Sequence, residues 1–143
     1  MTRDHYVDIN LMTQASGKER AMTMGYVDVC VSAVPAANRE AYEAHSAKCA
    51  EFFKEIGVAR IVECWEDDVP DGELTDFRKA VKAEEGEVVV VSWMEYPSKE
   101  ARDAASARMM EDPRMDELLK RAPYDGKRMF FGGFAPLLDV RGR

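Results

Sequence analysis

Two strand-like segments, each with a tryptophan two positions from a glutamate, constrain the fold of this chain most strongly. The first is Arg60–Trp65 and the second is Val88–Tyr96, which begins with four consecutive valines. Such a run is typical of a central strand buried on both faces. The acid–tryptophan pairs are Glu63 with Trp65 and Trp93 with Glu95. Residues two apart share a face of a strand, so we expect both pairs on one face of one sheet.

The segments around these strands alternate between strand and helix patterns. We predict strands over 26–34 and 127–134, helices over 37–56 and 99–111, and a short helix over 77–83. The resulting order is the ferredoxin-like βαββαβ arrangement, in which both long helices cover one face of a single antiparallel sheet. The predicted fold class is therefore α+β, with the other face of the sheet left without helices.

The face without helices is the predicted location of a functional site. Its candidate lining residues are Asp28, Glu63, Trp65, Trp93, Glu95 and Arg128. One chain cannot cover this face, whereas two sheets stacked face to face would bury its tryptophans and enclose a cavity lined by polar groups. The pattern therefore predicts a homodimer, in the form of a dimeric α+β barrel.

The chain length of 143 residues suits one domain, which we place at residues 24–143. Residues 1–23 lack a periodic apolar face, and we expect them to form a flexible extension. His45 lies on the apolar stripe of the helix predicted over 37–56, so we interpret it as a packed core residue rather than a ligand.

Composition argues against several classes of partner. A net charge of −7, with Lys and Arg interleaved among acids, repels nucleic acid. No apolar run approaches the ~20 residues that cross a bilayer. The three cysteines, Cys30, Cys49 and Cys64, lack metal-type spacing and are interpreted as free thiols. We therefore expect a cytoplasmic protein without a metal, a cofactor or a membrane partner.

Short motifs over residues 25–139 resemble those of a known bacterial family. Among them are Asp68-Val69-Pro70-Asp71-Gly72, Thr75-Asp76-Phe77-Arg78, Glu95-Tyr96-Pro97-Ser98-Lys99, Asp112-Pro113-Arg114-Met115 and Asp125-Gly126-Lys127-Arg128-Met129. They resemble the YbaA-like family, the DUF1428 domain of unknown function. That family is similar to the dimeric α+β barrels, which include cofactor-free oxygenases, haem-processing enzymes and ligand-binding domains. The resemblance implies the fold and supplies no catalytic residues.

Two roles are open for Glu63 and Glu95. In a poorly solvated pocket, carboxylates can exchange protons near neutral pH, and adjacent tryptophans can stack on a planar or cationic ligand. Alternatively, the two acids pair with Arg60, Lys82 or Arg128 across the dimer and fix its register.

Three functions follow from these alternatives. The favoured one is a homodimer that binds a small molecule in the cavity between the facing sheets. The second is a cofactor-free barrel enzyme, monooxygenase-like or isomerase-like, that uses the cavity carboxylates for proton transfer. The third is a structural or RNA-associated protein without a pocket.

Overall fold

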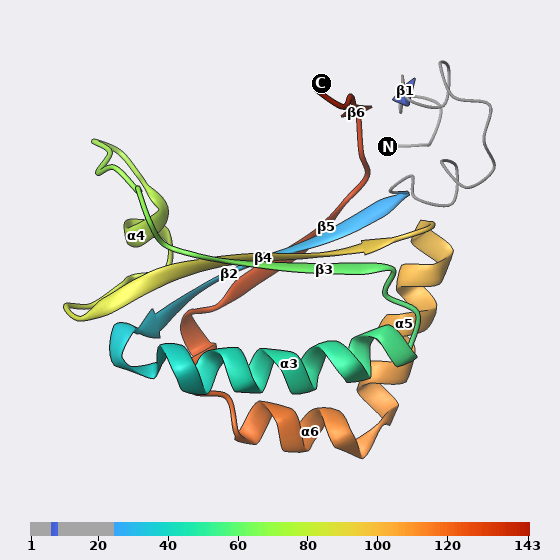
Figure 1. The fold of residues 1–143 in the computed structure, drawn as a ribbon, viewed down its shortest axis with the longest axis horizontal. Coiled ribbons are helices and arrows are strands. Elements are labelled where there is room, and N and C mark those ends of the chain that lie inside the picture. Colours follow the sequence, from blue (N-terminus) through green and yellow to red (C-terminus); the bar gives the residue numbers. More distant parts are fainter. Residues whose placement is uncertain (1–6, 9–24) are drawn as a thin grey trace.

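The computed structural model describes residues 7–8 and 25–143 (Figure 1). The main elements are β2 (Tyr26–Pro35), α3 (Arg39–Glu55), β3 (Arg60–Trp65), α4 (Phe77–Ala80), β4 (Glu87–Tyr96), α5 (Lys99–Glu111), α6 (Pro113–Lys120) and β5 (Phe130–Phe134). Two 3-10 turns, η2 (Ala36–Asn38) and η3 (Gly126–Arg128), precede α3 and β5. The predicted βαββαβ order and α+β class are confirmed. Apart from Val7–Asp8, the extension predicted over residues 1–23 lies outside the described residues.

Side-chain caps define where several helices begin. The helix predicted over 99–111 is confirmed as α5, and the Ser98 hydroxyl accepts a hydrogen bond from the Ala101 amide at 3.0 Å. Asp76 caps α4 in the same way through the Lys79 amide. Asn38, which precedes α3, makes no such bond; its Nδ2 donates to the Pro123 carbonyl at 3.0 Å. This bond ties the start of α3 to the segment that follows α6.

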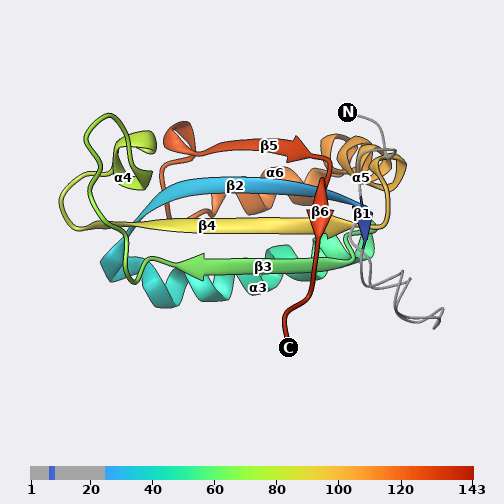
Figure 2. The same cartoon turned by 90° about the horizontal axis from the view of Figure 1, so that it is seen from above.

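The four long strands form an antiparallel sheet in the order β3–β4–β2–β5 (Figure 2). Helices α3, α5 and α6 all lie on one side of this sheet, which we call the covered face (Figure 1). The opposite side is the open face. Helix α4 stands above one end of the open face, and the segment that carries β6 (Leu138–Asp139) rises above the other end.

The main hydrophobic cores lie between the sheet and the helices. Tyr26 and Tyr96 pack against Phe52 and Ile56 of the α3 region at one end of the covered face. At the other end, Val34 and Val90 pack against Tyr42 of α3. A third, smaller cluster lies under α4 on the open face and consists of Val31, Ala33, Val81 and Val89.

The alternation within β2 is confirmed, but its expected orientation is wrong. The valine-rich side of β2 was expected to pack against the helices, and it lies on the open face instead. The covered face receives the mixed side with Tyr26, Asp28 and Cys30, because Tyr26 pairs with Tyr96 in the main core. The aromatic rings supply the bulk that fills the space below the helices. On the apolar side of this central strand, Val31 and Ala33 are buried under α4, whereas Val27 and Val29 are only half-buried.

Candidate functional site

The structure separates the two acid–tryptophan pairs. Glu63 lies opposite Ser92, and Trp93 lies opposite Val62. Residues directly opposite each other on adjacent strands point to the same side of the sheet. Trp93 and Glu95 therefore lie on the open face, whereas Glu63 and Trp65 lie on the covered face. The prediction that both pairs share one face is wrong, because the two patterns are out of phase by one residue in the actual register.

Asp28 and Arg128, the other candidates, both lie apart from Trp93 and Glu95. Asp28 is on the covered face, where Arg102 of α5 donates from Nε to Asp28 Oδ1 at 3.1 Å. Arg128 lies in η3 and binds both carboxylate oxygens of Glu87 at 2.6 and 2.7 Å. Of the six candidates, Trp93 and Glu95 lie together on the open face, Asp28, Glu63 and Trp65 lie on the covered face, and Arg128 contacts Glu87 at the other end of β4.

On the open face, Trp93, Glu95 and Arg60 form a polar triad. The indole Nε1 of Trp93 donates to Glu95 Oε2 at 2.9 Å, and Arg60 Nη1 lies 3.2 Å from the same oxygen. The Glu95 side chain is 15% exposed and that of Arg60 is 67% exposed. Glu95 is thus an ion-paired carboxylate, as one of the two alternatives for this residue anticipated, and its partner belongs to the same chain.

Apolar side chains surround this triad. Val27, Val29 and Val91 lie beside it in the centre of the sheet and are half-buried. Phe130 and Phe134 of the edge strand β5 also face this side, and they are 45% and 57% exposed. An antiparallel sheet that meets water normally carries polar residues on its outer face. This face has the composition of a surface that another molecule covers.

A second polar group lies on the covered face, between α3 and the edge strand β3. The Tyr42 hydroxyl donates a hydrogen bond to Glu63 Oε1. The Tyr42 ring lies 6.1 Å from that of Trp65, centroid to centroid, and the guanidinium of Arg39 lies 5.3 Å above the Trp65 ring. These side chains form one end of a groove of about 470 Å³, and Ala47, Ala50 and Ile61 line its apolar part.

The Tyr42 phenol and the nearby Cys49 and Cys30 thiols are all kept protonated by their surroundings. Burial and the hydrogen bond to Glu63 both raise the pKa of the Tyr42 phenol. Burial, together with the charge of Glu63, raises the pKa of the Cys49 thiol to about 11. The pKa of Cys30 is raised as well, mainly by burial. Neither thiol is the thiolate that nucleophilic chemistry requires at neutral pH.

His45 contacts Cys49 one helical turn away, with 3.4 Å between Nε2 and Sγ. Burial lowers the pKa of the imidazole, so His45 is neutral at physiological pH. Its ring also lies edge-on to Tyr124, 6.4 Å between centroids. These contacts fit the predicted role of a packed residue.

Sequence reasoning did not identify Arg39 and Tyr42 as site residues. Tyr42 lies on the apolar stripe of α3, a position that by itself indicates only core packing. The contact between Tyr42 and Glu63 joins residues 21 positions apart, so it depends on how α3 lies across β3. The one local signal is the spacing of Arg39 and Glu43, which form an i,i+4 ion pair at 3.3 Å.

The ion pair between Asp28 and Arg102 is a structural clamp. The guanidinium of Arg102 also lies 5.2 Å above the Tyr26 ring. A β-carbon at Gly133 of β5 would lie 2.5 Å from the Tyr26 hydroxyl and 2.7 Å from Arg102 Nη2. A larger residue at Gly133 would displace the ends of these two side chains from the clamp.

Arg128 and Glu87 form a second clamp, at the end of the sheet near α4. Hydrogen bonds from Arg128 lower the pKa of Glu87 to about 2. Arg128 also donates to the Lys82 carbonyl at 2.9 Å, which connects η3 to the turn after α4. The pair connects η3, the start of β4 and the turn after α4, and both oxygens of the Glu87 carboxylate are occupied.

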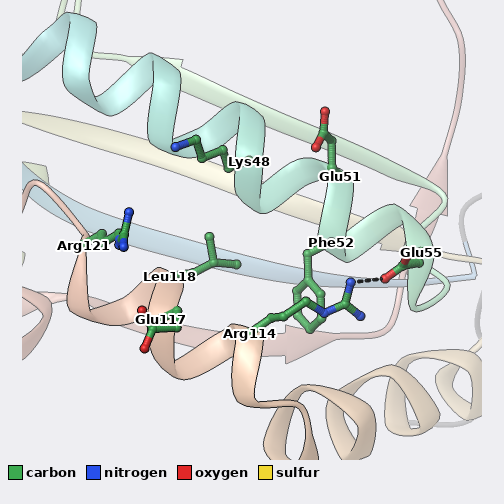
Figure 3. Close-up of a pocket in the computed structure, with 8 residues that line it drawn as sticks. All are labelled: Lys48, Glu51, Phe52, Glu55, Arg114, Glu117, Leu118 and Arg121. Atoms are coloured by element: carbon green, nitrogen blue, oxygen red, sulfur yellow. Dashed lines mark ion pairs between the residues drawn. The ribbon is translucent and has the colours of Figure 1, made fainter.

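The outer surface of the helices carries a cleft between α3 and α6 (Figure 3). Leu118 and Phe52 line it, and charged side chains of both signs surround them. Arg114 stacks 4.9 Å from the Phe52 ring centre and pairs with Glu55 at 2.7 Å. Because Arg114 is already satisfied by these contacts, we interpret the cleft as part of the packing of α6 on α3.

Residues 7–8 and 25–143 contain no group of three or more His, Cys, Asp or Glu side chains arranged to hold a metal ion. Within the same residues, no helix has the length and apolar character that crossing a membrane requires.

Comparison with known proteins identifies relatives over most of the chain. Residues 25–126 match the family model described as "Protein of unknown function (DUF1428)". The chain is 61% identical over 116 residues to the "Uncharacterized protein YbaA" of Escherichia coli strain K12, an alignment that covers 81% of this chain and 99% of the relative. The YbaA proteins of Escherichia coli O157:H7 and Shigella flexneri show the same identity and coverage. The chain therefore belongs to the DUF1428 family.

Proposed function

We propose that the protein is a homodimer that binds a small planar molecule between the open faces of its two sheets. The observation that carries this proposal is the apolar open face with the triad of Trp93, Glu95 and Arg60 at one end. Two copies stacked on these faces would form the dimeric α+β barrel expected from the sequence.

A second copy is the partner that suits the charge on this face. The chain has a net charge of −7, and two copies repel each other at long range. On the open face, however, the Glu95 carboxylate is offset by Arg60 at 3.2 Å. Phe130 and Phe134 extend the apolar area to the edge of the sheet. A stable interface buries about 800 Å² per partner, which is the scale of one face of a four-stranded sheet.

The triad supports ligand binding better than proton transfer. Glu95 Oε2 already accepts from Trp93 and pairs with Arg60, so this oxygen is engaged by contacts within the chain. An ion-paired acid is a poor general acid, whereas it fixes the Trp93 ring through the indole nitrogen. A ring held in this way offers a flat apolar surface for stacking, and the exposed Arg60 guanidinium offers donors to an acidic group on the ligand.

The oligomeric part of the proposal is tested with a matched pair of lysine variants. Val29 lies opposite Trp93 in the centre of the open face, and Ala44 is exposed on α3. Light scattering at micromolar concentration should give twice the chain mass of 16.1 kDa for the unmodified protein and for Ala44→Lys. Val29→Lys should give the mass of one chain with an unchanged circular dichroism spectrum. A monomeric unmodified protein would reject the dimer.

The ligand part is tested separately by native mass spectrometry of protein purified from cells. We expect an additional small mass on the dimer, which is lost in Val29→Lys and reduced in Trp93→Ala. A dimer that carries no additional mass in any preparation, and whose Trp93 fluorescence is unaffected by extracts of small molecules, would reject ligand binding while leaving the dimer intact.

A further inference from the structure

The groove between α3 and the edge strand β3 lies on the covered face, away from the proposed dimer interface. Its polar end contains side chains from both elements. They are Arg39, Tyr42, Glu43, Ser46, Glu63 and Trp65. Two carboxylates and two aromatic rings therefore border one groove of about 470 Å³, a volume that accommodates a small molecule.

Arg39 occupies the polar end of this groove. Its guanidinium lies 5.3 Å above the Trp65 ring, and its Nε lies 3.3 Å from Glu43 Oε1. A cation above an indole and beside a carboxylate is the arrangement that proteins use to recognise organic cations. In this groove, the cation belongs to the chain itself.

The contacts of Arg39 are weak enough to be exchanged. The Arg39 and Glu43 side chains are 61% and 66% exposed. Exposed ion pairs contribute little to stability, because water screens both charges and two long side chains lose conformational freedom. Displacement of Arg39 by another cation therefore costs the protein little.

Glu63 supplies a carboxylate that forms no ion pair with the residues that the structure describes. It accepts a hydrogen bond from the Tyr42 hydroxyl, a neutral donor whose raised pKa keeps the phenol protonated. An ionised carboxylate can accept about four hydrogen bonds, so the bond from Tyr42 leaves capacity for a ligand. This differs from Glu95, whose charge is offset by Arg60.

We propose that this groove binds a small organic cation, an amine or a guanidinium, and that Arg39 occupies the site until the ligand displaces it. The cation stacks on Trp65 between Glu43 and Glu63, and an aliphatic tail extends along Ala47 and Ala50 of α3. The net charge of −7 favours the approach of a cation.

The test uses Trp65 fluorescence in a Trp93→Phe background, which leaves Trp65 as the single tryptophan of the two in the chain. The probe is butylguanidinium, and its neutral isostere butylurea is the control ligand. Butylguanidinium should change the fluorescence saturably and butylurea should not. Arg39→Ala should tighten binding about threefold or more because it removes the internal competitor, whereas Glu63→Gln should weaken it about tenfold.

A charge-matched variant separates site binding from general attraction. Glu40 lies exposed in the first turn of α3, does not line the groove, and carries the same charge as Glu63. Glu40→Gln should leave the affinity for butylguanidinium unchanged. Calorimetry with and without Arg39→Ala, both with native Trp93, repeats the measurement independently of the fluorescence background.

Three results would overturn the proposal. The first is an equal response to butylurea, which would indicate an apolar groove without preference for charge. The second is a lack of saturation up to about 10 mM butylguanidinium with Arg39→Ala, in both fluorescence and calorimetry. The third is equal weakening by Glu40→Gln and Glu63→Gln, which would indicate attraction to the net charge alone.

Discussion

The two acid–tryptophan pairs of this protein contain the same residue types at the same spacing, in adjacent strands, and have different environments. Glu63 and Trp65 of β3 lie under α3, where Glu63 accepts from the neutral hydroxyl of Tyr42. Trp93 and Glu95 of β4 lie on the open face, where Glu95 binds the Trp93 indole and pairs with Arg60. The two pairs differ in the residue that contacts the acid, which is the neutral Tyr42 for Glu63 and the cationic Arg60 for Glu95. This third residue, and not the acid–tryptophan pair itself, decides whether the acid is ion-paired.

A cation as the third residue offsets the charge of the acid, and a phenol does not. The pair on the open face is therefore compatible with burial in an interface, where an unpaired charge would be costly. The pair on the covered face retains its negative charge and is compatible with a cationic ligand. Each of the following experiments tests this contrast.

Alanine substitution of the two tryptophans should give the largest difference. Trp65 packs against the core cluster of Val34, Tyr42 and Val90, so Trp65→Ala should lower the free energy of unfolding by about 3 kcal/mol. Trp93→Ala should cost about 1 kcal/mol within the chain and should weaken the dimer. Urea unfolding by circular dichroism at two protein concentrations measures both effects. Equal, concentration-independent losses would contradict the contrast.

The reactivity of the cysteines should differ about as strongly between the two faces. The pKa of Cys49 is raised from 9.0 to about 11, so at pH 8 it has about a hundredfold less thiolate than an ordinary thiol. Cys64 lies on the open face and is exposed. Labelling with a disulfide reagent should therefore be slow at Cys49 and fast at Cys64, and the Cys64 rate should fall as the dimer forms.

The same thiol predicts a pH dependence of stability. A raised folded-state pKa means that the contribution of the neutral Cys49 thiol is complete below pH 9 and is lost as the pH rises through about 11. Cys49→Ala should flatten the stability profile in this alkaline range, and Cys64→Ala should not. If stability falls equally steeply with pH in both variants, groups other than Cys49 cause the loss of stability at alkaline pH.

Removal of the charge on Glu95 should have a smaller effect. Glu95→Gln keeps an acceptor for the Trp93 indole but loses the ion pair, so we expect a loss of about 1.5 kcal/mol in the free energy of unfolding. Arg60→Ala should cost only about 0.5 kcal/mol, since this side chain is mostly exposed. Thermal melts near pH 7 compare the two variants. Stabilisation by Glu95→Gln would mean that the carboxylate is strained rather than paired.

The smallest effect should be the coupling between Tyr42 and Glu63. A double-mutant cycle of Tyr42→Phe and Glu63→Gln, measured by urea unfolding, should give an interaction energy of about 1 kcal/mol. A coupling close to zero would show that the phenol and the carboxylate act independently.

Local structure was predictable from sequence, whereas the relation between strands was not. The boundaries of α5 follow from the Ser98 cap and those of β3 from a β-branched run with flanking glycine and acids. The alternation within β3 and within β4 was also read correctly. However, residues 66–86 connect these strands, and a connection of this length does not set the register as a two-residue hairpin turn would. A change of one residue in the β3–β4 register moves every side chain of one strand to the opposite face of the sheet. The actual register places Glu63 on the covered face and Glu95 on the open face.

The sequence also did not show which side of a strand packs against the helices. In β2 the more apolar side was expected to be the covered one, because the apolar side of a strand normally packs against the helices of its own chain. The cores under the helices instead use the rings of Tyr26 and Tyr96. The open face retains the valines, and a pattern of hydrophobic residues does not indicate whether the chain itself or another molecule covers them.

The strand order has a consequence for the sequence of events in folding. β2 and β3 are separated in the sheet by β4, so neither pairs with the other. The closest paired residues are 25 positions apart for β3 and β4, at Trp65 and Val90, and 52 apart for β2 and β4, at Pro35 and Glu87. Shorter loops close at lower entropic cost, so we expect the β3–β4 pair to form before β2 joins it. During synthesis, the first 86 residues emerge without any native partner for β2 or β3 within the described sheet, and their exposure ends only when β4 leaves the ribosome.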